Sequence, residues 1–239
     1  MTYIILSAGK GAKLQPLTLN HPKSLYKLDD KTTILQRLVR KIRKYDLEAE
    51  IVVVVGYMYK QIQNELEDDN VKYVHNPFFS TTSSMGSLWF AKNFLQRENV
   101  TIINGDIVVS DNLMQDIVSQ HTDYPFVLYD STRKDANKYN VQIQGGLVCV
   151  MSKNLTEYAG NYASITKLDA VSSRFLLEQL NQMVNEEMYN LFYEDALVQM
   201  IFQKNFELYY KDIKDYQWTE VDCVDDLLRA RQIQTECEK

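Results

Sequence analysis

The chain has 239 residues, 45% of them hydrophobic, and its 32 acidic against 26 basic residues give a formal charge of −6. This hydrophobic content is enough for a packed core and excludes a disordered chain. The acidic balance, without a basic cluster, argues against nucleic acid as a partner. No apolar run approaches the ~18 residues that span a bilayer, and the N-terminus lacks the basic region of a signal peptide. The three cysteines lack the paired spacing of a zinc site or a disulfide framework. We therefore expect a cytoplasmic protein without a membrane or nucleic-acid partner.

The chain carries no linker, repeat or low-complexity tract that would divide it. Its length suits one α/β domain. We expect a single domain over residues 1–232, followed by a C-terminal tail at 233–239.

Strand-like and helix-like segments alternate in the first half of the chain. Residues 51–55 are an unbroken run of Ile and Val, which is typical of a strand buried on both faces. We expect strands at 3–7, 51–55, 71–75 and 101–104, and helices at 34–44, 58–67, 83–95 and, capped by Asp111, 111–120. Alternation at this interval predicts βαβ units and a mostly parallel sheet.

The second half of the chain shows a different pattern. Four strand-like segments follow one another, and Gly145-Gly146 is typical of a hairpin turn between two of them. We expect strands at 126–129, 141–144, 147–151, 162–167 and 206–210, helices at 171–187 and 193–203, an extended segment at 218–222, and a helix from about 224. The fold class is therefore α/β: a doubly wound, Rossmann-like, mixed and mostly parallel sheet with a small, partly antiparallel extension.

A loop with glycines and lysines follows the first predicted strand, in the stretch LSAGKGAKLQPLT, and HPKSL comes shortly after it. Gly9 and Gly11 allow backbone N–H groups to approach an anion, and Lys10, Lys13 and Lys23 can surround a triphosphate with positive charge. Open α/β sheets bind nucleotides beyond the carboxyl ends of their strands. The alternative is an ordinary connection with solvated lysines, because the stretch lacks the third glycine of a dinucleotide fingerprint and the Gly-Lys-Ser/Thr ending of a Walker motif.

Two acidic segments lie far from this loop along the chain. Asp106 ends the sequence IINGD, so a predicted strand delivers its carboxylate to the edge of the sheet, where a Mg²⁺ ligand would face phosphates. An isolated aspartate there is also compatible with a simple turn. In WTEVD, alternation places Glu220 and Asp222 on one side of an extended segment, whereas Asp225 or Asp226 would suit the start of the last helix.

Together these segments resemble nucleotidyltransferases that act on phosphate monoesters, whose signature is G-x-G-x-R-L-x-P-L-T followed by P-K. The group includes sugar-1-phosphate nucleotidylyltransferases and phosphocholine cytidylyltransferases of bacterial surface-polymer pathways. The resemblance implies that Asp106 and Asp222 bind Mg²⁺ and that Lys13 and Lys23 are catalytic with them. Lys13 stands where the family usually has arginine, so a point charge replaces a two-pronged donor.

The resemblance also implies a nucleotide-binding set in three places: the glycine loop, the Gly-Tyr turn after the second strand, and the segment TTSSMGSL. The alternative for the last segment is a loop that caps the following helix. The implied nucleotide-binding residues are Leu6, Ser7, Ala8, Gly9, Lys10, Gly11, Gly56, Ser84, Ser87 and Asp106.

The sequence FYEDA at 192–196 implies an acceptor site by the same resemblance. In phosphocholine enzymes the matching helix start surrounds the choline nitrogen with aromatic and acidic groups, which attract a quaternary ammonium. Tyr193, Glu194 and Asp195 would then bind the substrate, while Phe192 packs in the core. Lys167 is a candidate for the acceptor phosphate, or an ordinary lysine at the end of a strand.

The resemblance thus implies a Mg²⁺-dependent cytidylyltransferase that joins CMP from CTP to a small phosphomonoester, such as phosphocholine, and releases pyrophosphate. The short chain and the WTEVD ending favour this branch, with a cell-surface polysaccharide precursor as the product. One alternative is a sugar-1-phosphate nucleotidylyltransferase that uses UTP, dTTP or GTP. Another is a nucleotide-sensing module without activity. The oligomeric state stays open.

Overall fold

The structure is a computed structural model that describes residues 1–135 and 138–236. Within them the strands are β1 (Thr2–Ser7), β2 (Glu50–Val55), β3 (Lys72–His75), β4 (Asn99–Asn104), β5 (Ile107–Val109), β6 (Phe126–Asp130), β7 (Asn140–Gln144), β8 (Leu147–Ser152), β9 (Gly160–Asp169), β10 (Tyr209–Asp212) and β11 (Trp218–Glu220). The α-helices are α1 (Ile34–Tyr45), α2 (Tyr59–Glu65), α3 (Ser84–Phe90), α4 (Asp111–Leu113), α5 (Ala170–Asn185), α6 (Tyr193–Lys204) and α7 (Val224–Glu236).

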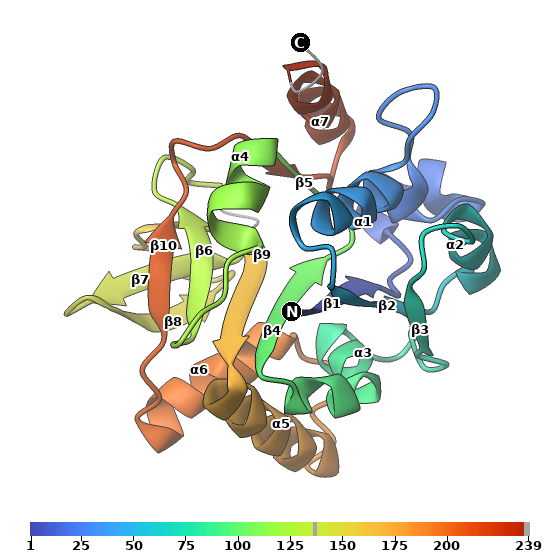
Figure 1. Ribbon diagram of the computed structural model, residues 1–239. Helices are drawn as coiled ribbons and strands as arrows, with labels where there is room; N and C mark the ends of the chain where they lie inside the picture. The colour runs from blue at the N-terminus through green and yellow to red at the C-terminus, as the bar shows by residue number, and fades with distance from the viewer. Residues whose placement is uncertain (136–137, 237–239) are drawn as a thin grey trace.

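A nine-stranded sheet forms the centre of the molecule, in the order β10-β6-β9-β4-β1-β2-β3, with β7 and β8 attached beside β9 (Figure 1). Strands β4, β1, β2 and β3 are parallel, and β10 is parallel to β6. Only β9 runs against its neighbours along this path. The expected mixed, mostly parallel sheet with a small antiparallel part is confirmed.

Alternating side chains of the central strands supply two cores, one on each face of the sheet. Tyr3 and Ile5 of β1 pack with α1, while Ile4 packs on the other face with residues of α3, α5 and α6. Figure 1 shows α1 above the sheet and α3, α5 and α6 below it. The unbroken apolar run of β2 follows from burial on both faces.

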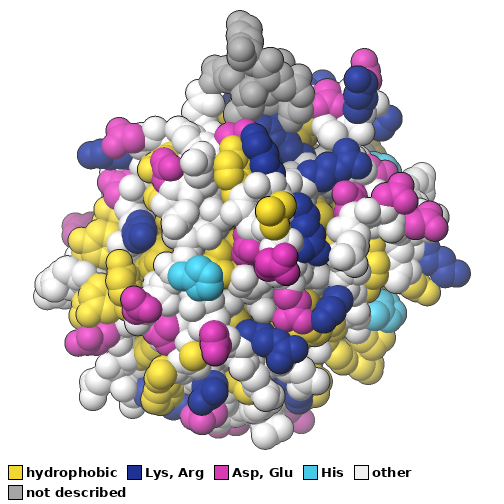
Figure 2. All heavy atoms as spheres, viewed as in Figure 1, with side chains coloured by type: hydrophobic (Ala, Val, Ile, Leu, Met, Phe, Trp, Pro, Cys, Tyr) yellow, Lys and Arg dark blue, Asp and Glu magenta, His cyan; other side chains and the backbone are white. Residues whose placement is uncertain are grey.

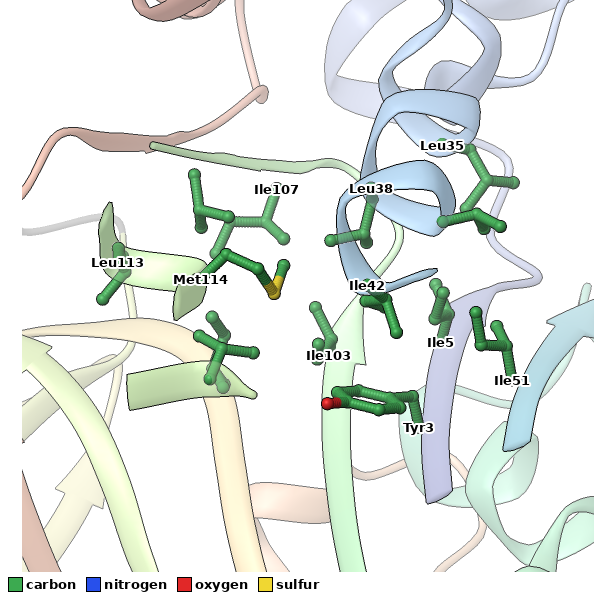
Figure 3. Packing of buried hydrophobic residues seen from close by; sticks show 14 of the residues in the cluster. Tyr3, Ile5, Leu35, Leu38, Ile42, Ile51, Ile103, Ile107, Leu113 and Met114 are labelled. Carbon is green, nitrogen blue, oxygen red and sulfur yellow. The ribbon is translucent and has the colours of Figure 1, made fainter. Parts of the chain in front are cut away.

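Helix α1 begins at a capped end and buries one side. The side chain of Thr33 accepts a hydrogen bond from the backbone N–H of Gln36, which satisfies one free donor of the first turn. Leu35, Leu38 and Ile42 follow at helical spacing, and Figure 3 shows them directed toward the sheet. This packing fixes the loop that precedes α1.

Strand pairing brings distant segments to one edge of the sheet. Leu6 is paired with Asn104, so β1 and β4 end side by side and the loops after them emerge together. Strand β11 then pairs with β5 next to this edge, and the N–H of Val221 donates to the carbonyl of Asp106 at 3.0 Å. The topology therefore places Asp222 beside Asp106.

Several expected boundaries differ from the structure. The helix expected at 83–95 is divided into α3 and a 3₁₀ helix, Lys92–Gln96, and α4 is capped by Ser110 rather than Asp111. Strand β5 was not expected, because three apolar residues are too short a run to predict one. The strand expected at 206–210 lies at β10, and the expected tail from 233 begins inside α7, while residues 237–239 lie outside the described residues.

The described helices include none that is both long and apolar enough to cross a membrane. On the face shown in Figure 2, acidic and basic side chains are interspersed, and no broad basic patch is seen there.

Leu38→Ala should lower the free energy of unfolding by ~2–5 kcal/mol, because it leaves a cavity between α1 and the sheet. The matched control is Leu47→Ala, since Leu47 is 81% exposed, and its effect should stay within about 0.5 kcal/mol. Urea denaturation of both variants measures this difference. Equal effects of the two substitutions would contradict the packing described.

Candidate functional site

Two adjoining cavities open at the carboxyl edge of the parallel strands. The first, of about 360 Å³, lies between the loop after β1, the loop before α3 and the turn after β4. The second, of about 270 Å³, lies between the turn after β1, the start of β9, the start of α6 and the segment after β11. The residues that line both cavities are Gly11, Ala12, Lys23, Asn104 and Phe192. The cavities are therefore two parts of one site.

The first cavity collects every residue predicted to bind nucleotide except Gly56. Gly11 has a φ of +64°, and a Cβ on it would lie 3.0 Å from the Cβ of Lys23, so glycine is required at this turn. Lys10 is exposed at the rim. The residues placed here are Leu6, Ser7, Ala8, Gly9, Lys10, Gly11, Ser84, Ser87 and Asp106.

The start of α3 presents hydroxyl groups to the first cavity. Ser84 accepts a hydrogen bond from the N–H of Tyr193 at 2.9 Å, and Ser87 accepts one from the amide of Asn76 at 3.0 Å. Ser83, the residue before α3, makes no side-chain hydrogen bond to the helix end. The alternative role of this serine as a helix cap is thus not what the structure shows.

Gly56 lies outside both cavities. A Cβ at this position would come within 2.6 Å of the Cβ of Phe79 and 2.8 Å of the carbonyl oxygen of Ala8. Phe79 and Ala8 themselves line the first cavity. Gly56 therefore allows the wall of the cavity to pack closely, but it does not line the cavity itself.

Lys23 joins the two predicted carboxylates where the cavities meet. Its ammonium contacts Asp106 Oδ2 and lies 2.9 Å from Asp222 Oδ1. Because one nitrogen touches both groups, Asp106 and Asp222 lie within a few ångströms of each other. Lys13, which is 57% exposed, reaches Asp222 Oδ2 at 2.9 Å. The structure thus brings together all four residues predicted to be catalytic.

The charges of this cluster shift one another's pKa values. Burial alone would lower the pKa of Lys23, but Asp106 and Asp222 outweigh burial and raise it above its ordinary value. Burial would raise the pKa of Asp222, but Lys23 and Lys138 hold it well below the usual range. Lys23 and Asp222 are therefore both charged at neutral pH.

A third lysine and a third carboxylate complete the cluster, and neither was assigned a role from the sequence. Lys138 lies 2.9 Å from Glu220 Oε2 and 2.5 Å from Asp222 Oδ2. Glu220 Oε1 accepts hydrogen bonds from Ser164 at 2.7 Å and Asn104 at 3.2 Å. The alternation in WTEVD indicated Glu220, but no local pattern distinguishes Lys138 from other surface lysines.

The carboxylates fit a small divalent cation that takes oxygen ligands. Asp106 Oδ1 is buried and has no hydrogen-bond partner among the residues that the structure describes, so it is available as a ligand. Within residues 1–135 and 138–236, no group of three or more His, Cys, Asp or Glu side chains is arranged to hold a metal ion. Two carboxylates with phosphate or water oxygens match the way Mg²⁺ is usually held.

The second cavity corrects the expectation for the start of α6. Tyr193 is fully buried, and its hydroxyl bonds to those of Tyr162 and Thr166, so its ring offers no face to a ligand. Phe192, expected in the core, is 37% exposed and lines both cavities. The reason is the bend at the helix start, which turns Phe192 outward and Tyr193 inward.

The two acidic residues beside Tyr193 differ in their surroundings. Asp195 accepts hydrogen bonds from the backbone N–H of Phe192 at 2.9 Å and from the hydroxyl of Tyr139 at 2.7 Å, so it holds the helix start and lines neither cavity. Glu194 lines the second cavity and is 4% exposed, and its Oε2 has no hydrogen-bond partner. Of the expected acceptor-binding residues, only Glu194 faces the site.

The structure does not support a phosphate-binding role for Lys167. This lysine is 1% exposed, and its ammonium donates to the carbonyls of Val118 and Gln120 at 2.6 Å. Strand β9 runs antiparallel to β4, so its start rather than its end lies at the edge with the cavities. Ser164, earlier in the same strand, lines the second cavity instead.

Glu194→Gln should stabilise the protein increasingly as pH rises. Burial raises the pKa of Glu194 from 4.5 to about 8. The folded state therefore holds a proton that the unfolded chain has lost between these pH values, so wild-type stability falls across this window. Glutamine cannot ionise, so the stability of the variant does not fall in this way. Urea denaturation at pH 5 and pH 8 compares the two proteins, and a difference that does not change with pH would refute the assignment.

Comparison with known proteins finds several similar proteins that are nucleotidyl transferases by name. The family model for nucleotidyl transferase matches residues 2–144. CTP:phosphoglutamine cytidylyltransferase of Campylobacter jejuni is 24% identical, over 95% of this chain and 98% of that protein.

Two solved structures show the same fold. The CTP:phosphocholine cytidylyltransferase of Streptococcus pneumoniae superposes with a TM-score of 0.79 at 19% identity, covering 98% of each chain. The inositol-1-phosphate CTP transferase of T. maritima gives a TM-score of 0.78 at 16% identity, covering 100% of this chain and 96% of that one. The family model covers more than half of the residues, and the chain therefore belongs to the nucleotidyl transferase family.

Proposed function

We propose that this protein transfers CMP from CTP to a small phosphorylated acceptor and releases pyrophosphate. The observation that carries the proposal is the meeting of Asp106 and Asp222 at Lys23, where the two cavities join. The first cavity, with its glycine loop, would take the nucleotide, and the second would take the acceptor. The transfer would occur where they meet.

The chemistry needs no covalent intermediate with the protein. The acceptor phosphate is ionised at neutral pH, so one of its oxygens can attack the α-phosphorus of CTP directly. The new P–O bond forms as the bond to the β-phosphate breaks, and pyrophosphate leaves with the electron pair. Because two anions must approach each other, charge neutralisation and orientation would lower most of the barrier.

Each charged residue of the cluster has a place in this scheme. Lys23, between the cavities, would neutralise the α-phosphate, and Lys13 at the rim would stabilise the departing pyrophosphate. Asp106 and Asp222 would hold Mg²⁺, which when bound supplies positive charge and a template for the phosphate oxygens. The buried, unpartnered Oδ1 of Asp106 supports this placement.

The names of the relatives support CTP as the donor. The Campylobacter jejuni relative and the two solved structures described above are named for CTP, while the acceptors in their names are phosphoglutamine, phosphocholine and inositol-1-phosphate. The shared feature of these acceptors is a small size and a phosphate. These names therefore support one donor, CTP, but do not single out one acceptor.

Pyrophosphate release with CTP, UTP, dTTP and GTP, each combined with Mg²⁺ and a panel of acceptors, tests the function. The panel contains phosphocholine, phosphoethanolamine, phosphoamino acids and sugar phosphates. We expect release with CTP only. Release with UTP, dTTP or GTP and a sugar-1-phosphate would favour the sugar nucleotide alternative, and no release with any pair would favour a sensing module.

Asp222→Asn should reduce turnover by at least ~10²-fold, because it removes one charged ligand from the proposed metal site. The variant should also bind Mn²⁺ more weakly, as measured by electron paramagnetic resonance of the free ion. Asp225→Asn is the matched control, since Asp225 is exposed at the start of α7. Normal turnover and normal Mn²⁺ binding in Asp222→Asn would reject the metal site.

Lys23→Ala should lower kcat more than it weakens CTP binding, because its charge is needed most when the α-phosphate becomes five-coordinate. Steady-state kinetics and equilibrium CTP binding separate the two effects. Lys60→Ala, at an exposed lysine outside both cavities, is the control. A variant with normal kcat and weaker CTP binding alone would show that Lys23 only binds the nucleotide.

A further inference from the structure

The second cavity is lined by a lysine that the proposed chemistry does not use. Lys153 follows β8, and its ammonium lies 3.7 Å from the ring centroid of Phe192 and 5.5 Å from that of Tyr139. Lys13, Lys23 and Lys138 also line this cavity, and each is paired with a carboxylate. Over residues 1–135 and 138–236, Lys153 has no ion pair or hydrogen bond in the structure. It is a half-buried cation that no carboxylate contacts directly, although Glu194, Glu220 and Asp222 lie near enough to counter the lowering of its pKa by burial.

Glu194 lines the same cavity and has a carboxyl oxygen that accepts no hydrogen bond from the described residues. Its Oε2 is buried without a hydrogen-bond partner, although Lys153 lines the same cavity. The two side chains do not form an ion pair in the structure, so each keeps a free bonding position. An unpaired buried carboxyl oxygen is costly, so a ligand that donates to it would bind with a favourable gain.

The position of Lys153 disfavours a ligand with a quaternary ammonium. Such a group binds by contact with aromatic faces, and Phe192 is an exposed ring that lines this cavity. The ammonium of Lys153 already covers that ring. A choline nitrogen placed there would meet a like charge at close range. An anionic group, in contrast, could form an ion pair with the ammonium of Lys153.

We propose that the acceptor carries a carboxylate in addition to its phosphate, together with an N–H or O–H donor beside that carboxylate. Lys153 would pair with the carboxylate, and Glu194 would accept from the donor. This describes a phosphorylated amino acid or hydroxy acid. The proposal rests on the proposed function, because that function assigns the second cavity to the acceptor.

Two pairs of phosphate compounds test the proposal, since the members of each pair differ by a carboxylate. O-phosphoserine is phosphoethanolamine with an added carboxylate, and 3-phosphoglycerate has a carboxylate where glycerol 3-phosphate has a CH₂OH group. Binding is measured by isothermal titration calorimetry with Mg²⁺, with and without a CTP analogue whose α–β bridge is carbon. We expect the carboxylate member of each pair to bind at least ~10-fold more tightly, as a charge-assisted contact provides.

Lys153→Met identifies the contact. This variant should reduce the preference within each pair to about twofold or less, while Lys153→Arg keeps most of it. The ratio within a pair is insensitive to partial unfolding, because unfolding weakens both members equally. Equal weakening of both members in Lys153→Met would show that Lys153 contacts the phosphate, and the proposal would be overturned.

Glu194→Met examines the contact with the donor, because it removes both accepting oxygens. It should weaken O-phosphoserine, which has an ammonium group, by several-fold more than 3-phosphoglycerate, which has a hydroxyl. Tighter binding of phosphocholine than of either carboxylate compound, or no binding of the carboxylate members in either condition, would overturn the proposal.

The same compounds separate this proposal from the proposed function. Pyrophosphate release from CTP with equal rates for both members of each pair would uphold the function and refute the carboxylate preference. Preferential binding of the carboxylate members without release from any nucleotide would uphold the acceptor class and refute the activity.

Discussion

The site depends on the ammonium of Lys23 between carboxylates that come from two distant parts of the chain. Asp106 and Asp222 would repel each other at this distance, and burial would make their charges more costly still. Lys23 offsets this cost at the point where both groups meet, and Lys138 does the same for Asp222 and Glu220. The cluster is therefore nearly balanced in charge before any ligand arrives.

The order and pairing of the strands explain why the two cavities meet at this cluster. The loop after β1 and the turn after β4 emerge together because their strands are adjacent and parallel. The pairing of β5 with β11 then returns the chain to the same edge. The carboxylates hold the lysines in position for a phosphate that enters this junction. The lysines in turn hold the carboxylates close together, in position to bind a cation.

The second cavity has a different character from the first. The first offers backbone and hydroxyl groups, which suit a nucleotide, whereas the second has four lysines, three carboxylates and three aromatic rings on its wall. Three of these lysines are paired with carboxylates, and the fourth, Lys153, covers the ring of Phe192. Selectivity for the acceptor therefore rests on which charges are left without partners.

The sequence by itself determined the features that local chemistry dictates. The apolar run of β2, the glycine loop after β1 and the aspartate after β4 each follow from residues close together in the chain, and so does the mostly parallel sheet. Tertiary structure decided the rest. The antiparallel direction of β9 moved Lys167 away from the site and placed Ser164 in it. The bend before α6 exchanged the expected places of Phe192 and Tyr193, and folding selected Lys138 and Lys153 from among the other lysines of the chain. Whether a charged side chain has a partner depends on segments that pair across the fold, and no local pattern in the sequence contains that information.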